Sequence, residues 1–307
     1  MPDPAPVIPT LPPPSVAERL RGAGRTLKRT LDAFTSRTLL RAAHARKRAA
    51  WQARINDVLA CPDYALLPRR PGAGAIAADG TQTMHNGLRI VPYSYYRWRG
   101  TAMFTATGGV HEPQEERVFA EVLKFVRSGG AMIELGAYWG FYSMWFAREV
   151  PGARCVLVEP LAENLSLGKA NFRLNGLSGE FVRAGVGATS GRIPKLGAMI
   201  CVDDLVAERG LGPIDILHCD IQGFEGDMLR GAARTLAAGK VRFAFVSTHT
   251  NALHAECRAA LVAHGFDIIA DADLDGTYSF DGVLVGQLRG TSGPGPVSIS
   301  QRTPKKG

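Results

Sequence analysis

The chain has 307 residues, which is long enough for one large domain with appended segments. Its hydrophobic fraction of 46% and charged fraction of 21% are typical of a soluble globular protein and exclude a wholly disordered chain. The net charge of +8 is concentrated in residues 18–57, where eleven Lys and Arg residues stand beside three acids. The rest of the chain is therefore neutral, so the charge does not mark the main domain as a nucleic-acid binder.

The cysteines argue against a disulfide framework. Five cysteines are odd in number, widely spaced and without a C-x-x-C pair, which predicts reduced core thiols rather than disulfides or a zinc site. No apolar run approaches the roughly 18 residues of a membrane span, and prolines stand where a signal peptide would be apolar. We therefore expect a cytoplasmic protein.

Changes in amino-acid composition along the chain divide it into segments. The first residues, MPDPAPVIPTLPPP, are Pro-rich. Leu20, Leu27 and Leu31 then recur at helical spacing. We expect a disordered leader at 1–14, a basic helical arm at 15–60, a small β-rich lead-in segment at 61–112, the main domain at 113–290 and a disordered tail at 291–307. The arm is interpreted as a solvated helix packed on the domain or a partner, with contact to a membrane surface or nucleic acid left open.

The main domain alternates strands with helices. A helix is predicted from Pro113, which is followed by acids in the first turn and an apolar face. Strands are predicted at 131–135, 154–158, 180–184, 214–220, 242–248, 266–271 and 281–287. This alternation predicts an α/β fold with a doubly wound, mainly parallel sheet of seven strands. The connection DADLDGTYSFDG is too short for a crossover helix, so the last strand is expected to be reversed.

The first βα turn, in MIELGAYWGFYS, has unusual glycine spacing. Glu134, Gly136 and Gly140 give E-x-G-x-x-x-G instead of the G-x-G-x-x-G of a pyrophosphate-binding turn. The bulky Tyr138 suits bare phosphate binding poorly. Glu159 ends the next strand, 23 residues after Gly136, where a carboxylate accepts hydrogen bonds from both ribose hydroxyls. Together these features predict an adenosine ligand without a pyrophosphate, and S-adenosylmethionine fits that description.

Several blocks also resemble one known family. MIELGAYWGFYS, VEPLAENLSLGKANFRLNG, CVDDLV, IDILHCDIQGFEGDMLRGA and FVSTHT follow one another as in FkbM-type S-adenosylmethionine-dependent methyltransferases, over about residues 84–287. The family's usual turn is closer to D-x-G-A-N-x-G, so this chain departs from it at Glu134, Tyr138 and Trp139. The resemblance implies a Rossmann-like class I methyltransferase sheet. It also implies cofactor contacts from Glu134, Gly136, Ala137, Gly140, Glu159, Ala184 and Gly185, with Tyr138 facing either the cofactor or the acceptor.

The ends of the fourth and fifth strands carry the candidate catalytic residues. We predict that His249 is a general base oriented by Asp220, because an acceptor hydroxyl must lose a proton. Glu225 and Gln222 are expected to shape the acceptor pocket. His249 as a helix cap is an alternative, and Asp220, His249 and His254 as ligands of a divalent metal is another, although their spacing matches no strong pattern.

Smaller signals concern the acceptor. No D/N-P-P-[YF] block follows the fourth strand, which favours O-methylation of a hydroxyl on a sugar, glycan or secondary metabolite over nitrogen methylation of nucleic acid. His111 and Glu112 are expected to contact ligand or to begin a helix, and His218 is expected to lie in the core. The alternative function is a non-catalytic adaptor that binds nucleic acid or a membrane through the basic arm.

Overall fold

The computed structural model describes residues 45–194 and 197–302, and its contacts divide the chain into the units 1–52 and 53–307. The predicted leader and most of the predicted arm therefore lie outside the described residues. Of the arm, residues 45–60 are helical, and the unit boundary falls inside this helix.

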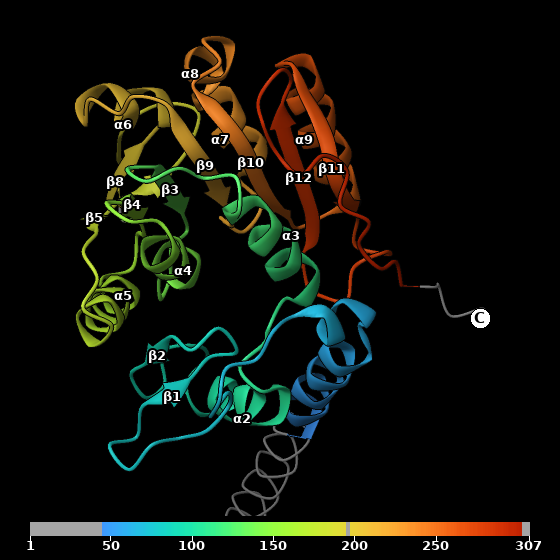
Figure 1. The fold of residues 1–307 in the computed structure, drawn as a ribbon. Helices are drawn as coiled ribbons and strands as arrows, with labels where there is room; N and C mark the ends of the chain where they lie inside the picture. The colour runs from blue at the N-terminus through green and yellow to red at the C-terminus, as the bar shows by residue number, and fades with distance from the viewer. Residues whose placement is uncertain (1–44, 195–196, 303–307) are drawn as a thin grey trace, which may run out of the picture. The chain divides into compact units, whose positions relative to one another are not determined.

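A seven-stranded sheet forms the centre of the second unit (Figure 1), with strand order β11-β12-β10-β9-β3-β4-β5. Its strands are β3 (Ala131–Leu135), β4 (Arg154–Val158), β5 (Glu180–Val182), β9 (Ile214–Cys219), β10 (Val241–Thr248), β11 (Phe266–Ala272) and β12 (Gly282–Leu288). All neighbours pair in parallel except β12, which is antiparallel to both β10 and β11. The predicted α/β sheet and its reversed last strand are confirmed, and β5 is two residues shorter than predicted.

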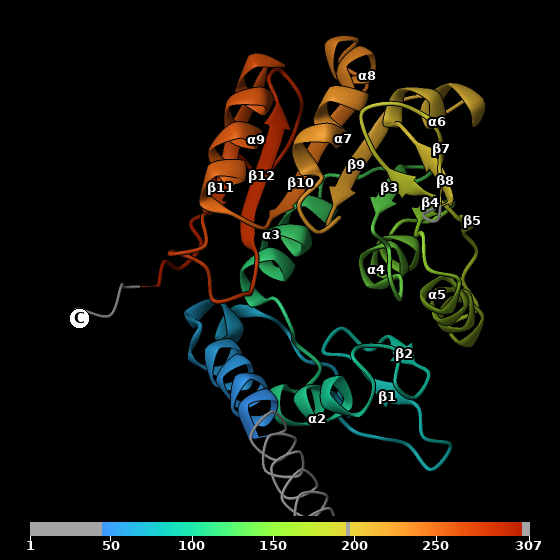
Figure 2. The ribbon, with the colours of Figure 1, turned by 180° about the vertical axis from the view of Figure 1, so that it is seen from behind.

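Helices cover both faces of this sheet. Their bounds are α3 (Pro113–Leu123), α4 (Phe141–Glu149), α5 (Ala162–Leu174), α6 (Val202–Glu208), α7 (Glu225–Gly231), α8 (Ala233–Ala237) and α9 (Asn251–Ala263). Figures 1 and 2 show α3, α4 and α5 on one face and α6, α7 and α9 on the other. β3 and β9 are buried along their whole length, as expected for strands that are covered on both faces.

A small second sheet was not predicted from the sequence. It contains β6 (Gly185–Val186), β7 (Gly191–Ile193) and β8 (Gly197–Ile200) in the order β6-β8-β7. All three residues of β7 are exposed. The strands are too short and too exposed for period-2 alternation to reveal them.

The lead-in segment is less β-rich than expected. It has a 3-10 helix η1 (Pro62–Leu66), two strands of two residues each, β1 (Gln82–Thr83) and β2 (Arg89–Ile90), and a helix α2 (Trp98–Thr107). The aromatic run PYSYYRW at 92–98, which has high β propensity, leads into α2 and forms no strand. Tyr95 stacks on Phe104 of α2 with ring centroids 5.3 Å apart, so tertiary packing overrides the β propensity of the aromatic residues.

The predicted disordered tail is wrong as far as Arg302. Ile299 is buried, and the Ser300 N–H donates to the Asp63 carboxylate at 2.7 Å. The Gln114 side chain donates to the Ser300 carbonyl at 2.6 Å. These bonds satisfy backbone groups that a Gly- and Ser-rich sequence leaves without sheet partners.

Two other predictions can be compared with the described residues. All five cysteines are buried and free, as predicted. No helix among the described residues combines the length and apolar character needed to cross a membrane.

Candidate active site

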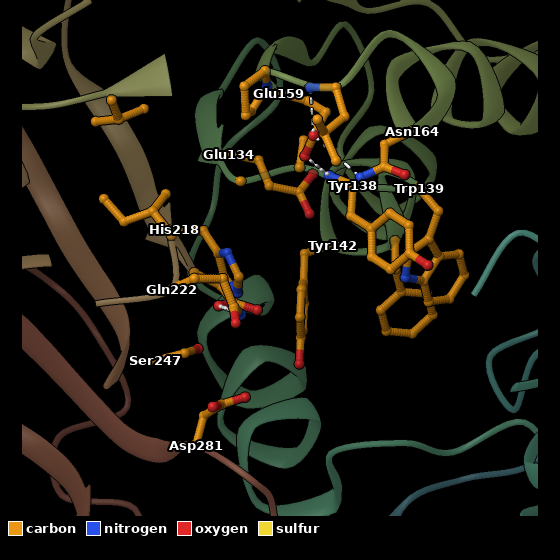
Figure 3. Close-up of a pocket in the computed structure, with 18 of the residues that line it drawn as sticks. Glu134, Tyr138, Trp139, Tyr142, Glu159, Asn164, His218, Gln222, Ser247 and Asp281 are labelled. Carbon is orange, nitrogen blue, oxygen red and sulfur yellow. Dashed lines mark hydrogen bonds between the residues drawn. The ribbon is translucent and has the colours of Figure 1, made fainter. Parts of the chain in front are cut away.

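A pocket of about 770 Å³ opens at the carboxyl ends of the parallel strands β3, β4 and β9, where ligands bind in open α/β sheets. It has two ends (Figure 3). The turn end contains Glu134, residues 136–139 and Glu159. The acid end contains Glu112, Asp220 and Asp281, whose charges act on one another. Tyr142 and His218 lie between them.

The turn after β3 depends on glycine at two positions. Gly136 has φ +75°, and a Cβ there would lie 1.8 Å from the Asp220 carbonyl oxygen, so no other residue fits. Gly140 has φ +77° and precedes α4, but its missing Cβ faces Leu157 and Phe172. Gly140 therefore shapes the turn from inside and does not line the pocket, whereas Gly136 and Ala137 do.

Glu134 is buried and accepts a hydrogen bond from the Ser143 N–H at 3.0 Å, which satisfies one free donor at the start of α4. Burial raises the pKa of its carboxyl, against the opposing charge of His218 and the Ser143 hydrogen bond. Glu134 thus lines the pocket with its Oε2 held by the backbone at the start of α4.

Glu159 is held by donors on three sides. Its Oε2 accepts from the Tyr138 N–H at 3.1 Å, and its Oε1 accepts from the Leu161 N–H at 2.8 Å and from Asn164 Nδ2 at 3.2 Å. A carboxylate has about four acceptor positions, so one remains on Oε2. The side chain lines the pocket with its orientation fixed.

The two bulky residues of the turn separate in the structure. Trp139 is 3% exposed and stacks on Phe141, with ring centroids 5.1 Å apart. Tyr138 has φ +47° and its hydroxyl accepts from the Tyr96 N–H at 2.9 Å. Gln222, at the acid end, also has a positive φ of +59°. Such backbone strain costs about 1–3 kcal/mol and gathers at functional sites.

Of the two cofactor contacts predicted after the third strand, Ala184 and Gly185, only one lies in the pocket. Gly185 lines the pocket, but Ala184 is buried in the hydrophobic core and does not. Neighbouring residues of an extended chain point to opposite sides. The predicted cofactor contact from Ala184 is therefore not supported by its side chain.

His249 and Asp220 are brought together, but the partner that holds the imidazole differs from the prediction. His249 Nδ1 lies 2.9 Å from Glu225 Oε1 in a hydrogen bond. Its Nε2 lies 3.4 Å from Asp220 Oδ1 and 3.2 Å from Asp281 Oδ1, and forms no hydrogen bond with either. Glu225 is fully buried and does not line the pocket, so it positions His249 and does not shape the acceptor pocket as predicted.

The structure supports neither the alternative that His249 caps a helix nor the alternative of a metal site that includes His254. Thr250, not His249, caps α9 by accepting from the Leu253 N–H at 3.0 Å. His254 lies between Thr248 Oγ1 at 2.7 Å and Asp271 Oδ1 at 2.8 Å, away from the pocket. A metal site that includes His254 is therefore not supported.

The acid end concentrates negative charge. Burial, followed by the charges of Asp281 and Glu112, raises the pKa of Asp220 to about 8, and burial with Glu112 raises the pKa of Asp281 to about 6. Burial lowers the pKa of His249, but the Glu225 hydrogen bond and the Asp281 charge together raise it to about 9. An imidazolium has no lone pair to accept a proton, which conflicts with the predicted general base.

Asp281 is the functional candidate that the sequence analysis missed. Gly282, the first residue of β12, pairs with Thr248, the last residue of β10. The reversed strand therefore begins at the edge where the parallel strands end. The residue before an antiparallel β12 lies at the same sheet edge as the residues after the parallel strands. The sequence FDG, in which Asp281 directly precedes the strand, therefore contained the signal for this candidate.

Glu112 and His218 both line the pocket, although His218 was expected in the core. Glu112 accepts a hydrogen bond from the Tyr142 hydroxyl at 3.2 Å. His218 is buried, and its Nε2 lies 2.6 Å from Glu115 Oε1. Its ring lies 4.3 Å from the ring of Tyr142. The rings of Tyr142 and His218 thus pack against each other in the middle of the pocket.

Comparison with known proteins supports a family. Residues 194–268 match the model of the Methyltransferase FkbM domain. The match begins near β8 and ends in β11, so it includes Asp220, Glu225 and His249 but not the turn after β3. No curated protein matches the chain.

Solved structures with a similar fold are distant. TrmK of M. capricolum, in complex with S-adenosyl-homocysteine, has 11% identity and a TM-score of 0.40 over 56% of this chain and 67% of that chain. A precorrin-6y C5,15-methyltransferase of Geobacter metallireducens GS-15 has 12% identity and a TM-score of 0.40 over 57% and 87%. A putative O-methyltransferase of Klebsiella pneumoniae has 15% identity and a TM-score of 0.35 over 52% and 72%. No argument about the site rests on likenesses this remote.

The family match contains two complete strands of the main sheet, β9 and β10, with Asp220 after the first and His249 after the second. The last strand of that sheet, β12, is reversed, as the resemblance implied. Over residues 194–268 the main domain is thus similar to the Methyltransferase FkbM domain.

Proposed function

We propose that the pocket binds S-adenosylmethionine at its turn end and transfers the methyl group to a hydroxyl oxygen of an acceptor held at its acid end. The observation that carries this proposal is the Glu159 carboxylate, which three hydrogen bonds hold in a fixed orientation beside a turn that suits phosphate binding poorly. Glu159 lines the same pocket as Asp220, which lies in the region of the family match.

The turn-end residues fit the proposed cofactor. Glu159 has an acceptor position left for a ribose hydroxyl, and carboxylates at this strand end bind ribose in related folds. Glu134 offers a buried anionic oxygen to the cationic amino-acid part. Gly185 lets a flat base approach the backbone, because it has no side chain to displace. A volume of about 770 Å³ is in the range of pockets for ligands of this size with an acceptor.

The rim of the pocket favours an acceptor with an apolar body. Five large apolar side chains that are 42–60% exposed also line the pocket: Tyr96, Leu161, Ile193, Phe224 and Phe280. Exposed apolar side chains that gather around one opening mark a binding site rather than ordinary surface. The acceptor is therefore a molecule such as a secondary metabolite or a lipid-linked sugar, with a hydroxyl that reaches the acid end.

When bound, the cofactor supplies a methyl group activated by its sulfonium, so that the acceptor oxygen bonds to carbon while the carbon–sulfur electron pair goes to sulfur and the hydroxyl proton leaves. The chain's residues mainly orient the reactants, which can supply about 7–11 kcal/mol of the barrier. Glu225 holds the His249 ring by its Nδ1, and the ring faces Asp220 and Asp281. Tyr142 and His218 line the pocket between the two ends.

The test has two steps. Calorimetry of the full chain with S-adenosylmethionine measures binding, and the protein with labelled cofactor and cell extract yields a labelled product whose methylated atom is identified by NMR. The Glu225→Gln variant is expected to bind cofactor normally and to lose most transfer, because the His249 ring loses its anionic partner. Glu256→Gln, a surface carboxylate paired with Arg230, is the matched control and is expected to transfer normally. Absence of cofactor binding at high micromolar concentration would refute the proposal.

A further inference from the structure

Asp220 and Asp281 at the acid end form, together with His249, a set of three ligand-type atoms from three different strand ends, although His249 itself does not line the pocket. Asp220 follows β9, His249 follows β10 and Asp281 precedes β12. One ligand atom from each lies within 4.8 Å of the other two. Two of the separations are 3.2 Å (Asp281 Oδ1 to His249 Nε2) and 3.4 Å (Asp220 Oδ1 to His249 Nε2).

These separations suit a shared cation better than a hydrogen bond. Bonds of about 2.1 Å from one ion to oxygen and nitrogen, at angles of about 90–110°, set neighbouring ligand atoms about 3.0–3.4 Å apart. His249 Nε2 is buried and has no hydrogen-bond partner among the described residues, although it points at two carboxylates. A buried nitrogen without a partner costs about 1–3 kcal/mol, and a metal ion at this position would bind Nε2 in place of the proton that the imidazolium carries there.

The surrounding residues fix this arrangement. Glu225, which is fully buried, holds His249 Nδ1 at 2.9 Å, and a carboxylate on the far nitrogen is the usual support of a metal-binding imidazole. Gln222, in a left-handed conformation, donates to Asp220 Oδ1 at 3.1 Å.

Charges around the site also favour a cation. Glu112 adds a third carboxylate to the same end of the pocket. Arg54 Nη2 lies 3.8 Å from Glu112 and also donates to the His111 carbonyl at 2.6 Å. With all three acids ionised, Arg54 and a protonated His249 leave one negative charge, and a divalent ion in place of the His249 proton would neutralise it.

We infer that Asp220, His249 and Asp281 bind a divalent metal ion, and that this ion holds the acceptor by its hydroxyl oxygen. This inference rests on the proposed function for the identity of the acceptor, but not for the metal itself. Two carboxylates and one imidazole suit an ion that accepts both oxygen and nitrogen, such as Mn²⁺ or Zn²⁺.

The ion would explain how an acceptor loses its proton at an end that lacks a free base. Three protein ligands leave coordination positions for one or two acceptor oxygens. A divalent ion acidifies a bound hydroxyl, so its proton leaves to water and the oxygen is free to bond to the methyl carbon. The acceptors that profit most have two neighbouring oxygens, such as a vicinal diol of a sugar or a catechol.

Metal binding is measured directly on the full chain after EDTA treatment and dialysis. Titration with Mn²⁺, followed by electron paramagnetic resonance, and with Zn²⁺, followed by calorimetry, is expected to give one bound ion per chain for at least one of the two metals. Asp281→Asn is expected to weaken that binding at least tenfold, because it removes one charged ligand and preserves the shape of the side chain. Asp220→Asn is the second variant and is expected to have the same effect.

The matched control is Asp271→Asn. Asp271 lies 2.8 Å from His254 in a similar acid–imidazole pair outside the pocket, so this variant is expected to bind metal as the unmodified chain does. Cofactor binding, measured on the same samples, separates the two proposals: a chain that binds metal but no S-adenosylmethionine refutes only the proposed function. A chain that binds the cofactor but neither metal, or equal binding by Asp281→Asn and Asp271→Asn, would overturn the metal site.

Discussion

The turn end and the acid end of the pocket are built differently. The turn end comes from one stretch, residues 134–164, and its contacts are mainly made by backbone N–H groups of that stretch. The acid end joins the side chains of Glu112, Asp220 and Asp281 from three separate segments. A site made by local backbone depends on a few glycine and carboxylate positions, whereas a site made by distant side chains depends on the whole sheet. Substitutions at the two ends should therefore fail in different ways.

Gly136→Ala is expected to have the largest effect. The new Cβ would lie 1.8 Å from the Asp220 carbonyl oxygen, so the turn end must move away from β9. We expect a loss of more than about 4 kcal/mol in the free energy of unfolding, or no folded protein. Chemical denaturation measures this loss.

Gly176→Ala separates the clash from the strain of a positive φ. Gly176 has φ +65° and an open space around its Cβ position, so alanine there should cost only about 1 kcal/mol. Equal losses in the two variants would mean that the close approach to Asp220 is unimportant.

Glu116→Gln tests the buried charges behind the turn end. Glu116 is fully buried, lies 3.0 Å from His85 Nε2 and accepts the His111 N–H at 2.9 Å. Although burial raises its pKa, the charges of His111 and His85 and their hydrogen bonds lower it well below 4.5. The variant should be less stable by about 3 kcal/mol at pH 7.

The sign of the pH dependence follows from that lowered pKa. A carboxyl whose pKa is lower in the folded state stabilises the fold above its unfolded value of 4.5, and this contribution is lost as the pH falls toward the folded value. The difference between Glu116→Gln and the unmodified chain should therefore narrow below pH 4.5 in urea denaturation. Glu121→Gln, in an exposed pair with Lys124, should give a small difference at every pH. A constant gap for Glu116→Gln would show that its charge does not matter.

Glu159→Gln should affect ligand binding more than folding. The amide replaces one acceptor oxygen with donors that face other donors. We expect cofactor affinity to fall about ten- to hundredfold, as for a lost hydrogen bond to a charged group. Glu163→Gln, an exposed carboxylate one turn further along and paired with Arg97, should bind as the unmodified chain does. Calorimetry compares the two, and similar affinities would remove Glu159 from the ribose contact.

Tyr138→Phe should have the smallest effect. It removes the acceptor of the Tyr96 N–H but keeps the ring in the pocket wall. A neutral hydrogen bond of about 0.5–1.5 kcal/mol predicts a two- to tenfold loss of cofactor affinity. A loss as large as that of Glu159→Gln would mean that the hydroxyl contacts the ligand itself.

The same contrast explains which features the sequence predicts. The strands, the reversed β12 and the turn end follow from apolar runs, glycine spacing and one carboxylate at a fixed distance along the chain. The hydrogen-bond partner of His249 does not follow from the sequence, because Glu225 and Asp220 both lie near this histidine. Only the packed structure shows that Glu225 is 2.9 Å from the His249 ring and Asp220 is 3.4 Å from it. The predicted cofactor contact from Ala184 is not supported for a similar reason. Ala184 lies between β5 and β6, and the sequence does not predict the small sheet that contains β6, so it does not predict which way the Ala184 side chain points.

The C-terminal segment has a practical consequence for protein production. Asp63 is fully buried, and it bonds the Arg117 side chain and the Ser300 N–H. A chain shortened to residue 290 would remove the Ser300 donor of this carboxylate and one hydrogen-bond partner of Gln114, which is two residues from the pocket residue Glu112. Trimming a segment that looks dispensable by composition would thus loosen the start of α3, and purification tags are better attached after Arg302 than in place of the residues before it.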